Sequence, residues 1–484
     1  MSAATTLRSG AAVRARLVFH PLWGFRSWAW VTVTCVAITG AVFVGVALGQ
    51  WRDYQNNAFD LAIFDQLLWN TAQGDVFKSS FVPYGQYMGQ HFSPVLFVLV
   101  PFYWLGAGAV FLTVLQGVVA AAAAVPLYFA ARRWVRSEAL AAALAGAYLL
   151  NPYLHRAVAF DFHPETMVAL PAFACAWAAS ERRFNLAFAL GASVLLFKDD
   201  SAYVAVALAA LIGWSGGRRQ GLALAVLAVA SFLAVNFAVM PLLRGGYEGD
   251  YVPRYDALAP GARTVPDLVL GLATHPWRLL VELGRPGVLW TMSLFVLSAP
   301  LMLARPAWLL ALIPGVWLAV LSSHPPQHSL ELHYAAQLAP LAVIGAMLGA
   351  GALRDRVDQR LLSAAAVVPA VIAFAALSPI SPFHDRPGRP TDEHRAALTE
   401  AVAIVPSHVR VSAQTSIVPR LAHRRTVKEF PGGVSNAEWV VIDRYGALSG
   451  ISVEWGYWPI LDYVREQWDL VFDRDGVQVF RRHD

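Results

Sequence analysis

Long apolar runs recur along this chain, and they restrict its fold more than any other feature of the sequence. Eleven runs can be marked, at 28–50, 109–131, 138–152, 165–181, 184–197, 199–215, 220–243, 287–304, 306–322, 334–353 and 360–378. Several are shorter than the roughly 20 residues that a membrane-spanning helix needs, so we expect those helices to extend into their flanks. Only 14% of the 484 residues are charged, whereas soluble proteins carry about 25%. The sequence therefore predicts an α-helical polytopic membrane protein with about eleven transmembrane helices.

Arginine residues between the runs predict how the helices are oriented. They are Arg132, Arg133 and Arg136; Arg182 and Arg183; Arg218 and Arg219; Arg305; and Arg354, Arg356 and Arg360. The positive-inside rule places such clusters in the cytoplasm. If the spans alternate, the N-terminal segment 1–27 is cytoplasmic and the chain from residue 381 lies outside. The apolar segment 91–105 must then not cross, and Pro94 and Pro101 suit a re-entrant or interfacial segment.

The last hundred residues have a different composition. From residue 381 charged residues return, and short strands and helices alternate. We expect strands at 408–413, 426–430 and 439–444, a helix at 392–405, and a hairpin at 468–482 that turns at Asp475-Gly476. The sequence therefore predicts a transmembrane domain over 28–380 and a small extracytoplasmic α/β domain over 381–484.

The net charge of +5 does not indicate a nucleic-acid partner. The arginines lie between apolar runs, where membrane topology requires them, so we expect a membrane lipid as partner and no nucleic acid. The two cysteines, Cys35 and Cys175, lie inside apolar runs and indicate neither a disulfide framework nor a metal site.

Acidic and histidine residues gather in the predicted outer loops. The first loop, 51–91, contains Asp60, Asp65 and His91, and the apolar residues around the two aspartates predict a helix on the membrane surface. The candidate residues of the other outer loops are Asp161, His163, Lys198, Asp199, Asp200, His333 and Tyr334. Charges at a membrane boundary are costly unless they are paired or functional. The loops together indicate a site that acts on a lipid-linked substrate at the outer leaflet.

Each of these residues also has a simpler explanation. Asp60 could cap a helix, and Lys198 could form a structural ion pair with the adjacent aspartates. His91 and His163 could be ordinary interfacial histidines. The aromatic residues Trp69, Tyr103 and Trp104 fit an interfacial belt better than a platform for a sugar.

Metal binding is expected to be weak. The spacing of His324, His328 and His333 matches no strong zinc motif, so we expect no structural zinc. Carboxylates prefer hard cations, so at most magnesium or manganese would bind near Asp60, Asp199 or Asp200.

Many short motifs occur in a familiar order. They are Phe59-Asp-Leu-Ala-Ile-Phe-Asp-Gln-Leu-Leu-Trp-Asn70, Gly89-Gln-His-Phe-Ser-Pro94, Phe160-Asp-Phe-His-Pro-Glu165, Lys198-Asp-Asp200 and His333-Tyr334. In this order they resemble the bacterial and archaeal membrane-protein family of domain of unknown function 2079, over residues 55–445. The chain departs from that family's pattern at Asp199-Asp200, where Glu-Asp is expected.

That family is similar in layout to the C-type glycosyltransferases, known as GT-C. The resemblance implies transfer of a sugar from a polyprenyl-phosphate donor, with Asp60 as the best match to the catalytic acid and Asp65 next. It implies that the remaining candidates bind the substrate. One carboxylate would act as base for the acceptor hydroxyl, and a lysine, arginine and histidine set would hold the donor phosphate. A transporter or flippase of a lipid-linked glycan and a non-catalytic scaffold for envelope assembly stay open as alternatives.

Overall fold

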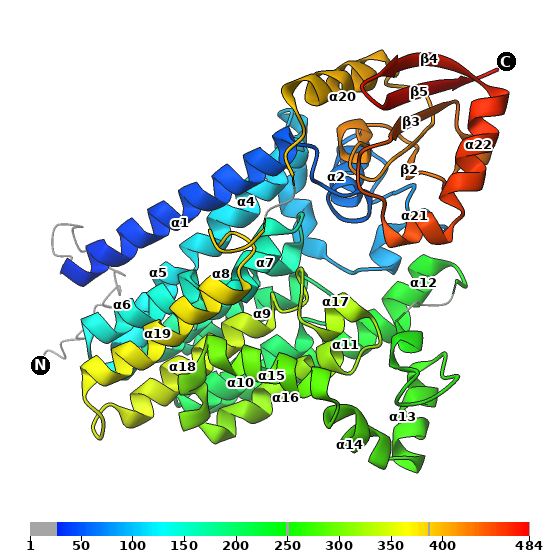
Figure 1. The fold of residues 1–484 in the computed structure, drawn as a ribbon. Coiled ribbons are helices and arrows are strands. Elements are labelled where there is room, and N and C mark those ends of the chain that lie inside the picture. The colour runs from blue at the N-terminus through cyan, green and yellow to red at the C-terminus, as the bar shows by residue number, and fades with distance from the viewer. Residues whose placement is uncertain (1–26, 248–250, 386–387, 484) are drawn as a thin grey trace, which may run out of the picture.

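The computed structural model describes residues 27–247, 251–385 and 388–483. It consists of a large helical part and a smaller part with one sheet, which lies at the end of the helical part where α1 ends (Figure 1). Most of the predicted N-terminal segment, with its arginines, lies outside the described residues. The predicted domain limits at 28–380 and 381–484 and the orientation in the membrane stay predictions.

Within the described residues, four helices are long and apolar enough to cross a membrane. They are α1 (Ser27–Arg52), the continuous helices α4 (Ala109–Ala122) and α5 (Ala124–Val135), the segment Arg218–Arg244 with α11 (Arg218–Ala234), η7 (Val235–Val239) and α12 (Met240–Arg244), and α19 (Gln359–Leu377). A fifth crossing results if α14 (Trp277–Leu283) and α15 (Pro286–Ser298), which meet at a bend of 63°, are one span. The chain is thus a multi-pass, mostly helical membrane protein, while the number of eleven crossings stays a prediction.

The other predicted runs also form helices, but these helices are short. They are α6 (Glu138–Leu149), α8 (Ala169–Ser180), α9 (Phe184–Ser193), α10 (Ala202–Trp214), α16 (Pro306–Val320) and α18 (Leu338–Leu353). Several of the elements that follow begin with proline, such as α7 (Pro152–Ala159) after α6. Proline has no backbone N–H, so it is tolerated in the first turn of a helix but not in its interior. The segment predicted not to cross contains η4 (Pro94–Leu99) and α3 (Val100–Trp104), which together are too short for a hydrocarbon core of about 30 Å.

Helix burial separates central helices from peripheral ones. Residues 338–350 of α18 are buried on every side of the helix, as expected for a helix at the centre of a bundle. By contrast, α1 exposes Trp30, Ile38 and Leu48, so lipid is the natural environment of that face. Where α1 packs against α4, a Cβ atom on Gly117 would lie 2.9 Å from Cβ of Phe43. Glycine therefore allows these two helices to approach closely.

The C-terminal part contains a five-stranded sheet in the order β2-β1-β3-β5-β4. The strands are β1 (Val411–Ala413), β2 (Val427–Glu429), β3 (Trp439–Asp443), β4 (Trp468–Arg474) and β5 (Val477–Arg482). The first three pair in parallel and the last two form the antiparallel hairpin. All five lie at the predicted positions, and so does helix α20 (Asp392–Ile404). Two helices that were not predicted, α21 (Gly450–Glu454) and α22 (Tyr457–Gln467), precede the hairpin.

The first outer loop lies between the helices and this sheet. It forms the π-helical turn η2 (Ala58–Ala62) and helix α2 (Ile63–Ala72), and α2 lies beneath the sheet in Figure 1. The predicted helix is present, and its position at the membrane surface stays a prediction. Its polar residue Gln66 is as fully buried as Leu67, and the amide of Gln66 donates to the carbonyl of Arg424 at 3.0 Å. The C-terminal part thus covers the polar face of this helix.

Candidate functional site

Asp161 fixes the loop that carries Asp60. Its carboxylate accepts hydrogen bonds from the side chain of Asn56 at 2.7 Å, and from the backbone and side chain of Asn57 at 2.9 and 2.8 Å. Burial and the nearby carboxylate of Asp60 raise the pKa of Asp161 to about 7, although these three donors act against the shift. Asp161 therefore holds two outer loops together rather than facing an open site.

Asp60 contacts the second outer loop directly. Nε2 of His163 lies 3.0 Å from Oδ1 of Asp60, and the backbone N–H of His163 donates to Gln116 of α4 at 2.7 Å. Burial lowers the pKa of His163, but the hydrogen bond and charge of Asp60 outweigh burial, so the pKa is raised overall. No helix is capped by Asp60, because the N-cap residue of η2 is Asn57.

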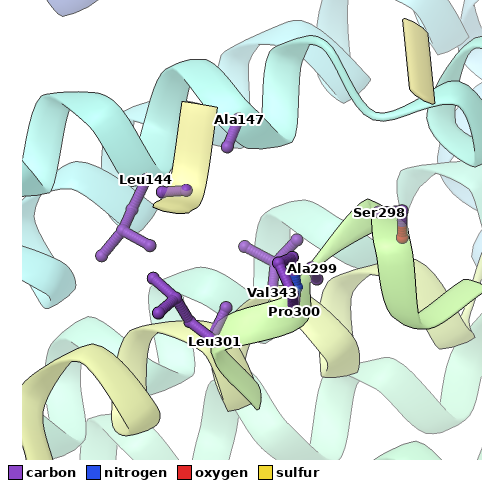
Figure 2. A pocket seen from close by; sticks show the side chains of 9 residues that line it. Leu144, Ala147, Ser298, Ala299, Pro300, Leu301 and Val343 are labelled. Carbon is purple, nitrogen blue, oxygen red and sulfur yellow. The ribbon is translucent and has the colours of Figure 1, made fainter. Parts of the chain in front are cut away.

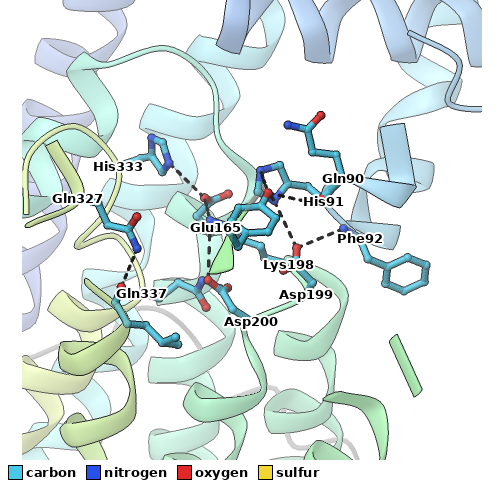
Figure 3. Close-up of polar contacts among 12 residues, drawn as sticks. Gln90, His91, Phe92, Glu165, Lys198, Asp199, Asp200, Gln327, His333 and Gln337 are labelled. Atoms are coloured by element: carbon cyan, nitrogen blue, oxygen red, sulfur yellow. Dashed lines mark hydrogen bonds and ion pairs between the residues drawn. The ribbon is translucent and has the colours of Figure 1, made fainter. Parts of the chain in front are cut away.

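A second group of contacts continues from His163. The rings of His163 and His333 stack with centroids 3.6 Å apart, and Nε2 of His333 lies 3.8 Å from Oε1 of Glu165. Nζ of Lys198 donates to the same oxygen of Glu165 at 2.8 Å. Figure 3 shows His333 and Lys198 approaching Glu165 from different segments. Asp60 and Lys198 therefore belong to one connected cluster, as the sequence predicted for a single site.

The remaining predicted residues lie around Lys198. Nδ1 of His91 lies 3.4 Å from Oδ1 of Asp199, and the hydroxyl of Tyr251 contacts Nε2 of His91 at 2.8 Å. Asp200 accepts a hydrogen bond from Gln337 at 2.6 Å and lies 3.9 Å from Nζ of Lys198. Figure 3 shows the Asp199 and Asp200 contacts on two sides of Lys198.

Tyr334 is also part of the cluster. Its ring centroid lies 4.4 Å from that of His333. The cluster is defined from here on as Asp60, His91, Asp161, His163, Glu165, Lys198, Asp199, Asp200, His333 and Tyr334.

Asp65 does not join the cluster. Its carboxylate accepts from the hydroxyl of Tyr103 at 2.8 Å and lies 3.2 Å from Nε2 of His423 in the C-terminal part. Tyr103 is buried, so it does not belong to an interfacial belt. Trp69 stacks on the ring of His423. Asp65 and Trp69 therefore form a contact between the first loop and His423 of the C-terminal part.

Sequence reasoning missed Glu165 as a member of the cluster. Glu165 ends the motif Phe160-Asp-Phe-His-Pro-Glu165 and begins the apolar run 165–181, but it was not chosen as a candidate site residue. The sequence signal was present, because Pro164 breaks the chain next to it and Glu165 is the only charged residue at that end of the run. Gln337 and Tyr251 carried no comparable signal.

The histidines at 324, 328 and 333 have separate partners. Nδ1 of His328 contacts the carbonyl of Val320 at 2.7 Å, the ring of His324 lies against Tyr334, and His333 belongs to the cluster. Among residues 27–247, 251–385 and 388–483, no three histidine, cysteine or carboxylate side chains are arranged to hold a metal ion.

Two cavities differ in character. The one in Figure 2 lies among apolar residues of α6, α15, α18 and α19 and has a volume of about 10 Å³, so it holds one water molecule at most. The other has a volume of about 260 Å³ and lies between the first outer loop and the C-terminal part. It is lined by Phe59, Phe81, Lys428, Glu429, Gly432 and Trp455. Neither of these two cavities is lined by Asp60 or by another member of the cluster.

Several solved structures are similar to the chain, and three of them are compared here with it. The apo oligosaccharyltransferase of Archaeoglobus fulgidus is 13% identical with a TM-score of 0.41, covering 86% of this chain and 70% of that one. Arabinofuranosyltransferase AftD from Mycobacteria is 15% identical with a TM-score of 0.46, covering 93% of this chain. This chain spans only 40% of the length of AftD. Apo ArnT from Cupriavidus metallidurans is 14% identical with a TM-score of 0.36, covering 91% of this chain and 97% of that one.

Comparison with curated proteins finds no match. The family model described as "Predicted membrane protein (DUF2079)" matches residues 51–477, which is most of the chain. The resemblance inferred from the motifs is thereby confirmed, and the chain belongs to the DUF2079 family of membrane proteins.

Proposed function

We propose that this protein is a membrane glycosyltransferase that transfers a sugar from a polyprenyl-phosphate donor to an acceptor hydroxyl at the outer face of the membrane. The observation that carries the proposal is the contact of Asp60 with His163, within a cluster that also contains Lys198. Asp60 keeps 22% of its side chain exposed, whereas Asp161 and Glu165 are buried. Of these three acids, Asp60 is therefore the one that a substrate can reach.

The proposed chemistry needs one base and one phosphate-binding group. The oxygen of the acceptor hydroxyl forms a bond to the anomeric carbon of the sugar. The Asp60 carboxylate takes the proton from that hydroxyl. The bond from that carbon to the phosphate oxygen breaks, and the polyprenyl phosphate leaves with the electron pair and the negative charge. His163 orients the carboxylate by donating from Nε2 to Oδ1 of Asp60. Asp65, which contacts Tyr103 and His423, has no part in this step.

Lys198 is the proposed contact for the donor phosphate. An ammonium group has three donors, and Nζ of Lys198 donates to Glu165 and has only a longer contact of 3.9 Å with Asp200. It therefore retains donor capacity for a phosphate oxygen, whose growing charge it would stabilise. His91 lies next to this position through Asp199.

The proposal also fixes an orientation. The cluster adjoins the C-terminal part, because the backbone N–H of Ala58, in the turn that carries Asp60, donates to Thr415 of that part. We propose that this end of the molecule is extracytoplasmic, with the N-terminus cytoplasmic. A reporter that works only in the cytoplasm, fused after Asp484, should then be silent. An active reporter would place the cluster on the cytoplasmic side and contradict an outer-face reaction.

The chemistry is tested by Asp60→Asn. Asparagine keeps the size of the side chain and removes the base, so transfer should be lost while the protein still folds. We would purify the protein with its bound lipid, identify the lipid by mass spectrometry, and follow its sugar after adding extracted cell-envelope glycans. Asp75→Asn is the matched control, because Asp75 lies in the same loop and pairs at the surface with Lys78. Equal transfer by wild type and Asp60→Asn contradicts the assignment of the base.

A further inference from the structure

The cavity between the first outer loop and the C-terminal part has the features of a binding site. Its volume of about 260 Å³ is slightly below the roughly 300 Å³ at the lower end of drug-sized sites, which suits a single ring. Three aromatic rings line it, since Phe59 meets Phe81 and Trp455 edge to face with centroids 5.9 Å apart in both cases. Such rings present flat apolar faces to a ligand.

Glu429 of β2 supplies a polar group to the same cavity. Its side chain is buried, with the residue only 1% exposed. The hydroxyl of Ser449 donates to its Oε1. Its Oε2 makes no hydrogen bond of good geometry among the described residues, although the hydroxyl of Thr415 lies close to the carboxyl group. A buried oxygen without a well-formed hydrogen bond is destabilising, because it has lost its contacts with water. A ligand hydroxyl in the cavity would remove that destabilisation.

The cavity also adjoins Asp60. Phe59, which lines it, is the residue before Asp60, and the backbone N–H of Ala58 donates to Thr415 Oγ1 of the C-terminal part at 3.1 Å. This contact holds the start of η2 against the C-terminal part. The Asp60 carboxylate is close enough to Glu429 to act on it electrostatically. Asp60 thus belongs to the cluster through His163 and is the chain neighbour of Phe59, which lines the cavity.

We propose that this cavity is the acceptor subsite and holds one terminal sugar ring of the acceptor glycan. The ring lies against Trp455 and Phe59, one of its hydroxyls contacts Oε2 of Glu429, and another faces Asp60. Aromatic faces combined with a carboxylate match a sugar ring, which has apolar C–H faces and a rim of hydroxyls. The inference rests on the proposed function, because it uses Asp60 as the base, and it names the acceptor as a carbohydrate.

Binding can be measured without any donor. The probes are methyl glycosides of common hexoses and pentoses, added separately to the purified full-length protein, and the readout is saturation-transfer NMR. At least one glycoside should receive saturation from wild type. Trp455→Ala should reduce that signal at least about fivefold, and Glu429→Gln should also reduce it.

Two control variants separate the cavity from its surroundings. Trp458→Ala removes an exposed tryptophan outside the cavity, and Glu454→Gln neutralises an exposed glutamate next to Trp455. Both should bind like wild type. Asp60→Asn should also bind, since it removes the base and leaves the cavity lining unchanged.

The outcomes distinguish this inference from the proposed function. If transfer occurs but Trp455→Ala and Glu429→Gln bind and transfer like wild type, the acceptor subsite is wrong and the function stands. If glycosides bind in the cavity but no transfer is found, the cavity stands as a sugar-binding site, and the proposed function is wrong. If no glycoside receives saturation from wild type at tens of millimolar, the inference is overturned.

Discussion

Nε2 of His163 lies 3.0 Å from Oδ1 of Asp60, although 103 residues separate the two in sequence. An ionised carboxylate only accepts hydrogen bonds, so Nε2 must carry the proton in this contact. Nδ1 of the same ring is buried and has no partner among the described residues. The ring is held by its stacking on His333 and by the backbone contact to Gln116. His163 is therefore suited to orient Asp60, and we regard it as a positioning residue.

Replacing His163 tests this role. His163→Ala leaves the Asp60 carboxylate in place without its donor, and loss of alignment by about 1 Å can cost about 100-fold in rate. We expect a fall of that order in kcat, with little change in thermal stability. His163→Gln keeps an N–H donor near the same position and should recover part of the rate. Equal losses for the two variants would contradict a role through hydrogen bonding to Asp60.

We expect the buried side chain of Glu429 to make the free energy of unfolding depend on pH. Burial raises its pKa to about 7, above the usual value near 4.3. A raised pKa means that the folded protein binds the proton more tightly, so this stabilisation is complete below the usual pKa and is lost as pH rises through about 7. Glu429→Gln stays neutral and should therefore be more stable than wild type at pH 8.5, by on the order of 3 kcal/mol. Near pH 4.5 the two should match.

Thermal unfolding in detergent at both pH values measures this difference. Glu454→Gln serves as the control, because Glu454 is exposed and its replacement should leave the pH dependence of unfolding unchanged. A constant difference between Glu429→Gln and wild type at the two pH values would show that the carboxyl group is not titrating in this range.

Local patterns in the C-terminal part were sufficient to predict its strands. Asp475-Gly476 identified the turn of the hairpin, and the turn residues have positive φ angles as such turns require. Helix α22 was missed although the residues that it buries, Tyr457, Leu461 and Val464, recur at helical spacing. In the membrane part, the apolar runs predicted where the helices lie. The lengths of these runs did not determine how many of the helices cross the membrane.

For the candidate site, the sequence could predict only which loops lie on the same side of the membrane. Asp60, His163 and Lys198 were expected to meet because their loops were assigned to one side of the membrane, and the structure brings them into one cluster. The separation of Asp65 from Asp60 was not predictable, because it follows from the contact with His423, which is 358 residues away in sequence. Tertiary contacts of that kind leave no local pattern.

The ion pair between Lys198 and Glu165 allows a test between a structural and a functional role for the lysine. Nζ and Oε1 lie 2.8 Å apart, and the two side chains are 14% and 5% exposed. Removing one partner of a buried pair leaves an uncompensated charge and costs about 3–5 kcal/mol, whereas replacing both by neutral groups is often nearly neutral. Lys198→Met alone should therefore unfold at a markedly lower temperature than wild type.

The double variant Lys198→Met with Glu165→Gln should regain most of the lost thermal stability, because no unpaired charge from this pair remains. If Lys198 binds the donor phosphate, this stable double variant should still fail to transfer sugar, since nothing replaces the ammonium group. Glu165→Gln alone is the matched control for the missing carboxylate, because Lys198 then keeps its contact with Asp200 and its charge for the phosphate. Transfer by the double variant at the wild-type rate would show that the lysine serves only to neutralise Glu165.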